Sequence, residues 1–109
     1  MENEESGHPR IVTLSATGRA REEWPRFLGD YSLTERQHLG RPVYSNSEGR
    51  HLYSLESGAW ALGWVGARVP AMRSSDQASG PAVCQLWQYR EYKSSECEYQ
   101  DGDISVTVK

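Results

Sequence analysis

Residues 41–65, RPVYSNSEGRHLYSLESGAWALGWV, decide the fold of this chain. They contain three short runs of apolar and aromatic residues, separated by breaks at 45–49 (SNSEG) and 56–58 (ESG). Glycine, asparagine and serine form tight turns at little cost. In 60–64 (WALGW) the large apolar residues alternate with small ones, which is the period of a β-strand. The stretch therefore predicts three antiparallel strands joined by two tight turns.

Further strands are expected on both sides of this stretch, where β-branched and apolar residues cluster. The expected strands are 10–15 (RIVTLS), 27–33 (FLGDYSL), 83–89 (VCQLWQY) and 103–108 (DISVTV). Residues 20–24 favour one helical turn, which Pro25 ends because the residue before a proline disfavours the helical conformation. The connectors are then 34–40, 66–82 and 90–102. Seven strands and almost no helix predict an all-β fold, an antiparallel meander forming a small sandwich or a partly open barrel.

The length and composition indicate one domain. A chain of 109 residues, 37% hydrophobic and 25% charged, is long enough for one modest core. Residues 1–9 are acidic and without periodicity, so we expect a flexible N-terminal tail followed by a single β-domain over 10–109.

The charge and the hydropathy pattern exclude some partners. A net charge of −3 argues against a nucleic-acid partner. No stretch has the roughly 20 apolar residues of a membrane span, so we expect no membrane partner. The polar, acidic N-terminus does not resemble a secretory leader, and we therefore expect a cytoplasmic protein with Cys84 and Cys97 as free thiols.

No reaction chemistry stands out. The sequence lacks a G-x-S-x-G elbow, a Walker loop and an H-E-x-x-H motif, and its three histidines share no metal-ligand spacing. Cys84 lies within an apolar strand pattern, where a thiol usually serves packing. The acidic residues of 96–103 could attract calcium, but Asp101-Gly102-Asp103 is also a good turn signal. We therefore predict no catalytic residue, no metal and no cofactor.

The aromatic residues are unusually rich in tryptophan and tyrosine, with four Trp, six Tyr and one Phe. Both side chains carry a polar group and suit sites where one end is buried and the other is wet. Trp60, Trp64 and Trp87 are expected in the core rather than on a binding platform. The rings expected at the surface are Tyr44, Tyr53, Tyr89, Tyr92 and Tyr99.

The candidate binding site combines the long 66–82 connector with the strand that begins at Arg41. Binding residues concentrate on loops held by a rigid scaffold, and Arg and Tyr dominate binding hot spots. The candidate site residues are Arg41, Tyr44, Tyr53, Arg68, Arg73, Ser74, Ser75 and Asp76. The chain has ten arginines and only two lysines, and arginine's planar fork suits an interaction surface. An ordinary solvated loop is the alternative interpretation of 66–82.

The order of several short motifs supports an interaction role. In chain order these are Gly29 to Tyr31, Gly40 to Tyr44, Leu52-Tyr53, Gly58 to Trp60 with Gly63, the small-residue loop 74–81, Trp87 to Tyr89, and Asp103 to Val106. This order resembles a pattern in eukaryotic proteins, mostly repeated or accessory β-modules of unassigned function, and covers 27–108. It departs from that pattern in the highly charged 90–102 connector. The resemblance implies a small β-fold used as an interaction module and carries no catalytic residues.

Together these features predict a noncatalytic binding or interaction module whose ligand is a protein, a small molecule or a glycan. One alternative is a carbohydrate-binding domain, which needs a row of exposed Trp or Tyr rings. Another is a small enzyme with a site near Arg41, His51 and the 66–82 loop.

Overall fold

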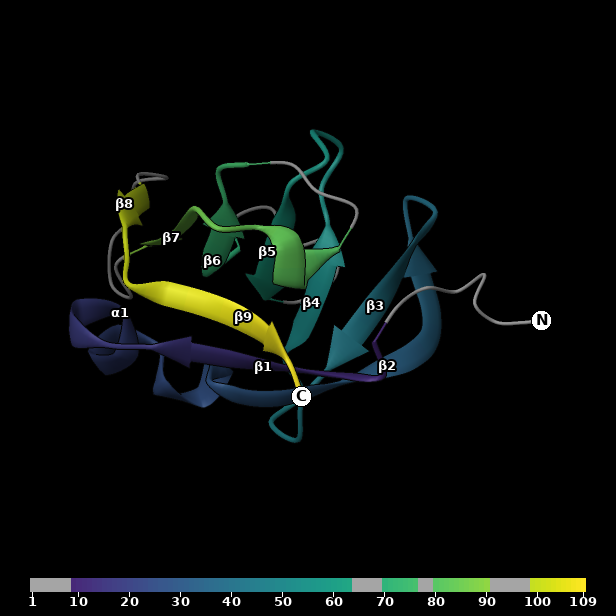
Figure 1. The fold of residues 1–109 in the computed structure, drawn as a ribbon, viewed down its shortest axis with the longest axis horizontal. Coiled ribbons are helices and arrows are strands. Elements are labelled where there is room, and N and C mark those ends of the chain that lie inside the picture. The colour runs from purple at the N-terminus through teal and green to yellow at the C-terminus, as the bar shows by residue number, and fades with distance from the viewer. Residues whose placement is uncertain (1–8, 64–69, 77–79, 91–98) are drawn as a thin grey trace.

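The computed structural model describes residues 9–63, 70–76, 80–90 and 99–109 (Figure 1). In chain order the elements are β1 (Ile11–Ala16), α1 (Gly18–Glu23), the 3-10 turn η1 (Pro25–Phe27), β2 (Gly29–His38), β3 (Arg41–Ser45), β4 (His51–Ser54), β5 (Trp60–Gly63), β6 (Met72–Ser74), the 3-10 turn η2 (Pro81–Val83), β7 (Trp87–Arg90), β8 (Tyr99–Asp101) and β9 (Ile104–Val108). The all-β prediction is confirmed.

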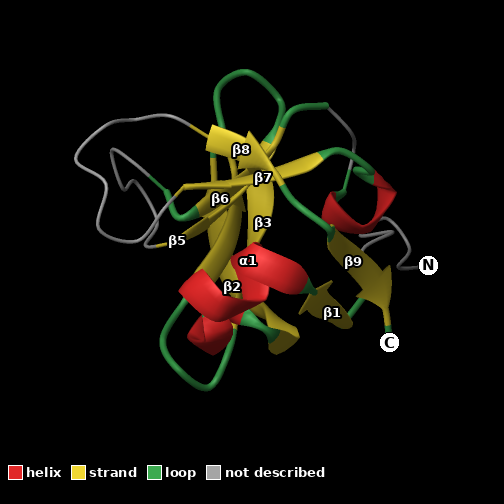
Figure 2. Ribbon diagram, turned by 90° about the vertical axis from the view of Figure 1, so that its left-hand side faces the viewer, coloured by secondary structure: helices red, strands yellow, loops and turns green. Residues whose placement is uncertain are grey.

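The nine described strands form one antiparallel sheet in the order β8-β7-β6-β5-β4-β3-β2-β1-β9. Each strand up to β8 pairs with its sequence neighbour, and β9 returns to pair with β1, with Val12 opposite Val108. The single sheet curls strongly, and α1 lies across one end of the curl (Figure 2). Of the two predicted architectures, the structure is therefore the partly open barrel.

The curl brings the segment before β9 against β7. The Gly102 amide donates to the Trp87 carbonyl at 3.2 Å. A Cβ atom at Gly102 would lie 2.9 Å from side-chain carbons of both Ile104 and Tyr89. This position therefore needs a glycine because a larger residue would push the two packed side chains apart.

The central meander forms as the sequence predicts. At the first break the Asn46 side-chain oxygen accepts hydrogen bonds from the amides of Glu48 (3.0 Å) and Arg50 (2.8 Å), an Asx-type turn. At the second break the Leu55 amide donates to the Ala59 carbonyl at 2.8 Å. Both turns bring their flanking strands into antiparallel register.

The sheet is buried on both faces along its central strands. The main core lies inside the curl, and its largest fully buried side chain is Trp60. A smaller cluster of Val43, Tyr53 and Ala61 lies on the opposite face, with Leu55 packed against it. Trp60 and Trp87 are core residues as predicted, whereas Trp64 lies outside the described residues.

Several connectors contain more structure than the sequence indicates. The expected connector 34–40 is largely strand, because β2 continues to His38 and re-pairs with β3 after a bulge. The expected loop 66–82 contains β6 and part of η2, and the expected connector 90–102 contains β8. The expected strand 83–89 begins only at Trp87, since the amides of residues 85 and 86 bond to a carboxylate rather than to a neighbouring strand.

Candidate functional site

Four of the eight residues predicted from the sequence to form a site border two small cavities. Arg41 lines a cavity of about 400 Å³. Arg73, Ser74 and Ser75 line a second cavity of about 280 Å³, and Leu55 borders both. The two cavities therefore meet at Leu55, while β4 and β5 lie between β3 and β6 in the sheet.

The polar groups of Ser74 and Asp76 are engaged in holding the fold. The Ser74 hydroxyl accepts a hydrogen bond from the Trp60 amide at 2.9 Å and donates to the Asp76 carbonyl at 2.8 Å. The Asp76 carboxylate accepts the amides of Gln85 (2.9 Å) and Leu86 (3.3 Å). These bonds satisfy backbone groups that the sheet leaves unpaired, so both residues have a structural task.

Tyr44 and Tyr53 are buried, and the prediction that their rings lie at the surface is wrong. Tyr44 packs in the main core and donates its hydroxyl to the Pro9 carbonyl at 2.8 Å, and burial raises its pKa. Tyr53 is 1% exposed, and its ring meets His38 edge to face at 5.5 Å. The physical reason is that both faces of the central strands are covered, so neither neighbour in Val43-Tyr44 reaches solvent.

Other predicted surface rings differ from one another. Tyr89 is also buried, contrary to the prediction. Tyr99 is partly buried, and the guanidinium carbon of Arg73 lies 3.9 Å from its ring centroid. Tyr92 and Arg68 lie outside the described residues.

The structure separates Arg41 from His51, the two named residues of the enzyme alternative. Ser45 pairs with His51 across β3 and β4, and Arg41 is four residues before Ser45. At about 3.3 Å per residue this displaces the two backbones by about 13 Å along the strands. Cys84 is buried beside the Asp76 carbonyl, and burial raises the pKa of its thiol, which disfavours the reactive thiolate.

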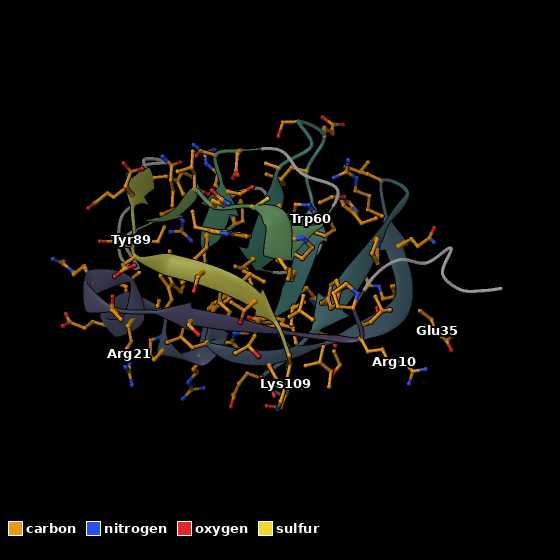
Figure 3. All side chains as sticks on the ribbon, in the orientation of Figure 1. Arg10, Arg21, Glu35, Trp60, Tyr89 and Lys109 are labelled. Carbon is orange, nitrogen blue, oxygen red and sulfur yellow. The ribbon has the colours of Figure 1, made fainter. Side chains whose placement is uncertain are left out.

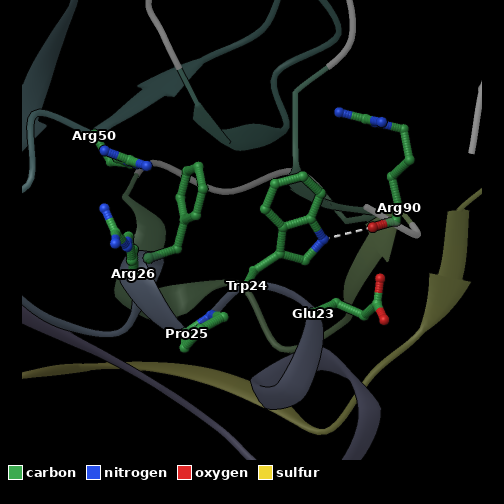
Figure 4. A pocket seen from close by; sticks show the side chains of 7 residues that line it. Glu23, Trp24, Pro25, Arg26, Arg50 and Arg90 are labelled. Carbon is green, nitrogen blue, oxygen red and sulfur yellow. Dashed lines mark hydrogen bonds between the residues drawn. The ribbon is translucent and has the colours of Figure 1, made fainter. Parts of the chain in front are cut away.

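A larger pocket lies elsewhere, at the end of the curl that α1 covers (Figure 4). Its volume is about 730 Å³. The residues that line it are Glu23, Trp24, Pro25, Arg26, Phe27, Arg50 and Arg90. We call this the arginine pocket. In the described chain it has three arginines, two aromatic rings and one carboxylate.

Local structure explains how the aromatic floor forms. Pro25 ends α1 and starts η1, as its fixed φ predicts. The tight turn brings Trp24 and Phe27 edge to face, with ring centroids 5.4 Å apart and an interplanar angle of 88°. The Trp24 indole N–H donates to the Arg90 carbonyl, a bond drawn in Figure 4 that ties η1 to β7.

Two of the arginines lie over these rings. The guanidinium carbon of Arg50 lies 5.4 Å from the Phe27 ring centroid, and that of Arg90 lies 5.4 Å from the Trp24 ring. The Arg50 guanidinium also donates to the Glu48 carbonyl. The contact with a ring limits the rotamers of both side chains, and the hydrogen bond limits those of Arg50 further, so less entropy is lost when their guanidinium groups bind a ligand.

The third arginine is carried by η1 itself. Arg26 is exposed, and its carbonyl accepts a hydrogen bond from the Asn46 side-chain amide at 3.1 Å. This bond joins η1 to the turn that leads into Arg50. Figure 4 shows Arg26 and Arg50 on one side of the Trp24 indole, with Glu23 and Arg90 on the other.

Sequence reasoning missed the arginine pocket because its residues come from three distant segments. The curl of the sheet and the α1–η1 turn bring residues 23–27, 50 and 90 together. One signal was present: the excess of arginine over lysine indicated an interaction surface without saying where it lies.

Two further observations concern the described part of the chain. No group of three or more His, Cys, Asp or Glu residues there is arranged to hold a metal ion. No helix there is both long and apolar enough to cross a membrane.

Comparison of the chain with protein-family models, with curated proteins and with solved structures gave no match. The function is therefore inferred from the geometry and charge of the arginine pocket.

Proposed function

We propose that this chain is a noncatalytic binding module that holds an anionic ligand in the arginine pocket. The observation that carries the proposal is the lining of that pocket, in which three arginines and one carboxylate of the described chain lie around two aromatic rings. The volume of this pocket, about 730 Å³, lies within the range of small-molecule sites. Arginine remains protonated at all physiological pH values and binds carboxylate or phosphate through two parallel hydrogen bonds.

The way in which the pocket holds its arginines supports binding rather than catalysis. Two of its arginines, Arg50 and Arg90, lie over aromatic rings, and a cation held in this way binds and orients an anion. The order of sequence motifs, which resembles that of accessory β-modules, agrees with this role. The proposal includes a cytoplasmic location and no nucleic-acid partner. Cys84 is a buried free thiol, and Cys97 lies outside the described residues.

The carbohydrate alternative has less support. A glycan-binding platform needs exposed rings, but Trp24, Trp60 and Trp87 are at most 8% exposed, and Tyr31, Tyr44, Tyr53 and Tyr89 are buried. In the described chain only Tyr99 presents a partly exposed ring of these two types.

A thermal-shift experiment tests the proposal. The probes share one ring: benzoate and phenyl phosphate are anions, benzyl alcohol is neutral and benzylamine is a cation. At about 0.15 M salt, where exposed charges are screened, the anions are expected to raise the melting temperature of the wild-type protein. A ligand that binds only the folded state stabilises it by mass action.

The matched variants are Arg26→Ala and Arg10→Ala. Both arginines are exposed, and each substitution removes one positive charge. Arg10 lies at the opposite end of the molecule from Arg21 of α1 (Figure 3). The anion effect should fall by at least half in Arg26→Ala and persist in Arg10→Ala. Equal shifts in all three proteins, or a larger shift with benzylamine, would contradict the proposal.

A further inference from the structure

The two ends of the arginine pocket differ in charge. Arg26 and Arg50 lie at one end, whereas Arg90 shares the other end with Glu23 (Figure 4). Glu23 is the one carboxylate among the described lining residues. Its Oε2 atom also lies 3.4 Å from the Arg19 Nε atom of the same helix. The first end is therefore strongly cationic, and the second offers both a hydrogen-bond donor and an acceptor.

The pocket is larger than a single inorganic anion. Its volume of about 730 Å³ lies within the range of sites that bind organic molecules, so a phosphate held at the Arg26 end would leave most of it unfilled. A ligand that reaches both ends thus needs an organic body between its anion and its far end.

We propose, on the basis of the function proposed above, that the ligand is an organic phosphate monoester. Its phosphate binds between Arg26 and Arg50, and its body crosses the Trp24 edge towards Glu23 and Arg90. A phosphate monoester carries a charge of about −1.5 to −2 at pH 7 and three acceptor oxygens. Two guanidinium groups match this dianion in charge, whereas a carboxylate would neutralise only one of them.

The Glu23 end of the arginine pocket indicates the chemistry of the ligand's organic body. The Glu23 carboxylate accepts a hydrogen bond, and the Arg90 guanidinium donates one. Figure 4 shows the Glu23 carboxylate and the Arg90 guanidinium pointing away from each other, so separate hydroxyl groups of the ligand would meet them, each being both a donor and an acceptor. A polyhydroxylated body such as that of a sugar phosphate therefore fits this end better than a purely apolar one.

Four compounds that share a glucose body test which anion the pocket prefers. Glucose, glucuronate, glucose 6-sulfate and glucose 6-phosphate are each titrated into the wild-type protein, and binding is measured by calorimetry. We expect the phosphate to bind at least about tenfold more tightly than the sulfate or the carboxylate. Inorganic phosphate should bind more weakly than glucose 6-phosphate because it lacks the body.

The pH dependence gives a second test. The phosphate monoester loses half of its second charge near pH 6, so its affinity should fall as the pH is lowered from 7.5 to 5.5. Glucose 6-sulfate keeps a constant charge and reports any titration of the protein itself. The relevant titratable group of the protein is His51, which follows Arg50 in the chain. Burial lowers the pKa of His51, and the charge of Arg36 lowers it further. A fall in affinity for the sulfate equal to that for the phosphate would contradict the inference.

Substitutions at Arg26 and Glu23 test which part of the ligand each end of the arginine pocket binds. Arg26→Lys keeps the positive charge but loses the planar guanidinium group, so it should weaken phosphate binding less than Arg26→Ala does. Arg10→Ala is the control. Glu23→Gln should strengthen the binding of inorganic phosphate, because it removes a negative charge, and should give a smaller gain for glucose 6-phosphate, whose hydroxyl group exchanges a charged acceptor for the weaker amide oxygen of glutamine. Equal gains for both ligands would overturn the assignment of the body to the Glu23 end.

The outcomes separate this inference from the proposed function. If glucuronate binds as tightly as glucose 6-phosphate and Arg26→Ala weakens both, the phosphate inference fails while anion binding stands. If none of the anions binds at millimolar concentration, both fail.

Discussion

Replacing Trp60 with alanine is expected to lower the free energy of unfolding by about 3–5 kcal/mol, the usual cost of removing a large buried aromatic side chain. Trp60 is 0% exposed and lies in the main core on strand β5, which has strands on both sides. Its amide is held by the Ser74 hydroxyl, and Arg41 lies over its ring at 5.8 Å. Since domains of this size are stable by only about 5–15 kcal/mol, the variant should be close to unfolding.

Urea denaturation followed by far-ultraviolet circular dichroism measures this loss. Val108→Ala is the matched control, because Val108 is an apolar strand residue that is 61% exposed. The control should change the unfolding free energy by no more than about 0.5 kcal/mol. A loss below about 1 kcal/mol for Trp60→Ala would contradict the position of Trp60 at the centre of the core.

Replacing Trp24 with alanine should also cost about 3–5 kcal/mol and abolish ligand binding. Trp24 is 8% exposed, stacks edge to face on Phe27, and donates its indole N–H to the Arg90 carbonyl. Its loss removes the pocket floor, the ring under the Arg90 guanidinium, and the link between η1 and β7.

Trp24→Phe separates these contributions. It keeps an aromatic ring on Phe27 and loses the indole hydrogen bond, a net cost of about 0.5–1.5 kcal/mol together with some packing. The unfolding free energy in urea should therefore fall in the order wild type, Trp24→Phe, Trp24→Ala. Equal losses in the two variants would show that ring packing contributes little at this position.

The sequence was informative where a strand has a clear alternating pattern and turn residues at both ends. The breaks at 45–49 and 56–58 place β3, β4 and β5 almost to the residue. The pattern fails for β6 and β8, which have three residues each and are too short to show a period. It also fails for the second half of β2, whose sequence TERQH is polar and whose strand conformation depends on pairing with β3.

Alternation also assigns residues to a face without saying whether that face is covered. Val43 and Tyr44 point to opposite sides of β3, as expected of neighbours in a strand. Both are fully buried because the core inside the curl covers one side and the cluster with Tyr53 lies on the other. For that reason Tyr44 and Tyr53, which the sequence places at the surface, are buried.

The arginine pocket lay beyond prediction for a different reason. Its position depends on the curl of a nine-stranded sheet and on the turn at Pro25, which bring residues far apart in the chain to one end of the barrel. The tight turn itself could be predicted, since Pro25 follows a short helix-favouring segment. The residues that lie beside this turn in the folded protein could not be predicted.

Mapping the bound ligand by two-dimensional ¹H–¹⁵N NMR tests the central claim most directly. The protein is titrated with glucose 6-phosphate, and the Trp24 indole signal is assigned from its disappearance in Trp24→Phe. The account predicts saturating shifts of that indole signal and of the backbone amides of Arg26, Arg50 and Arg90, with the amide of Ser75 unmoved. Shifts confined to Ser75 and its neighbours on β6, or no shifts at saturating ligand, would contradict it.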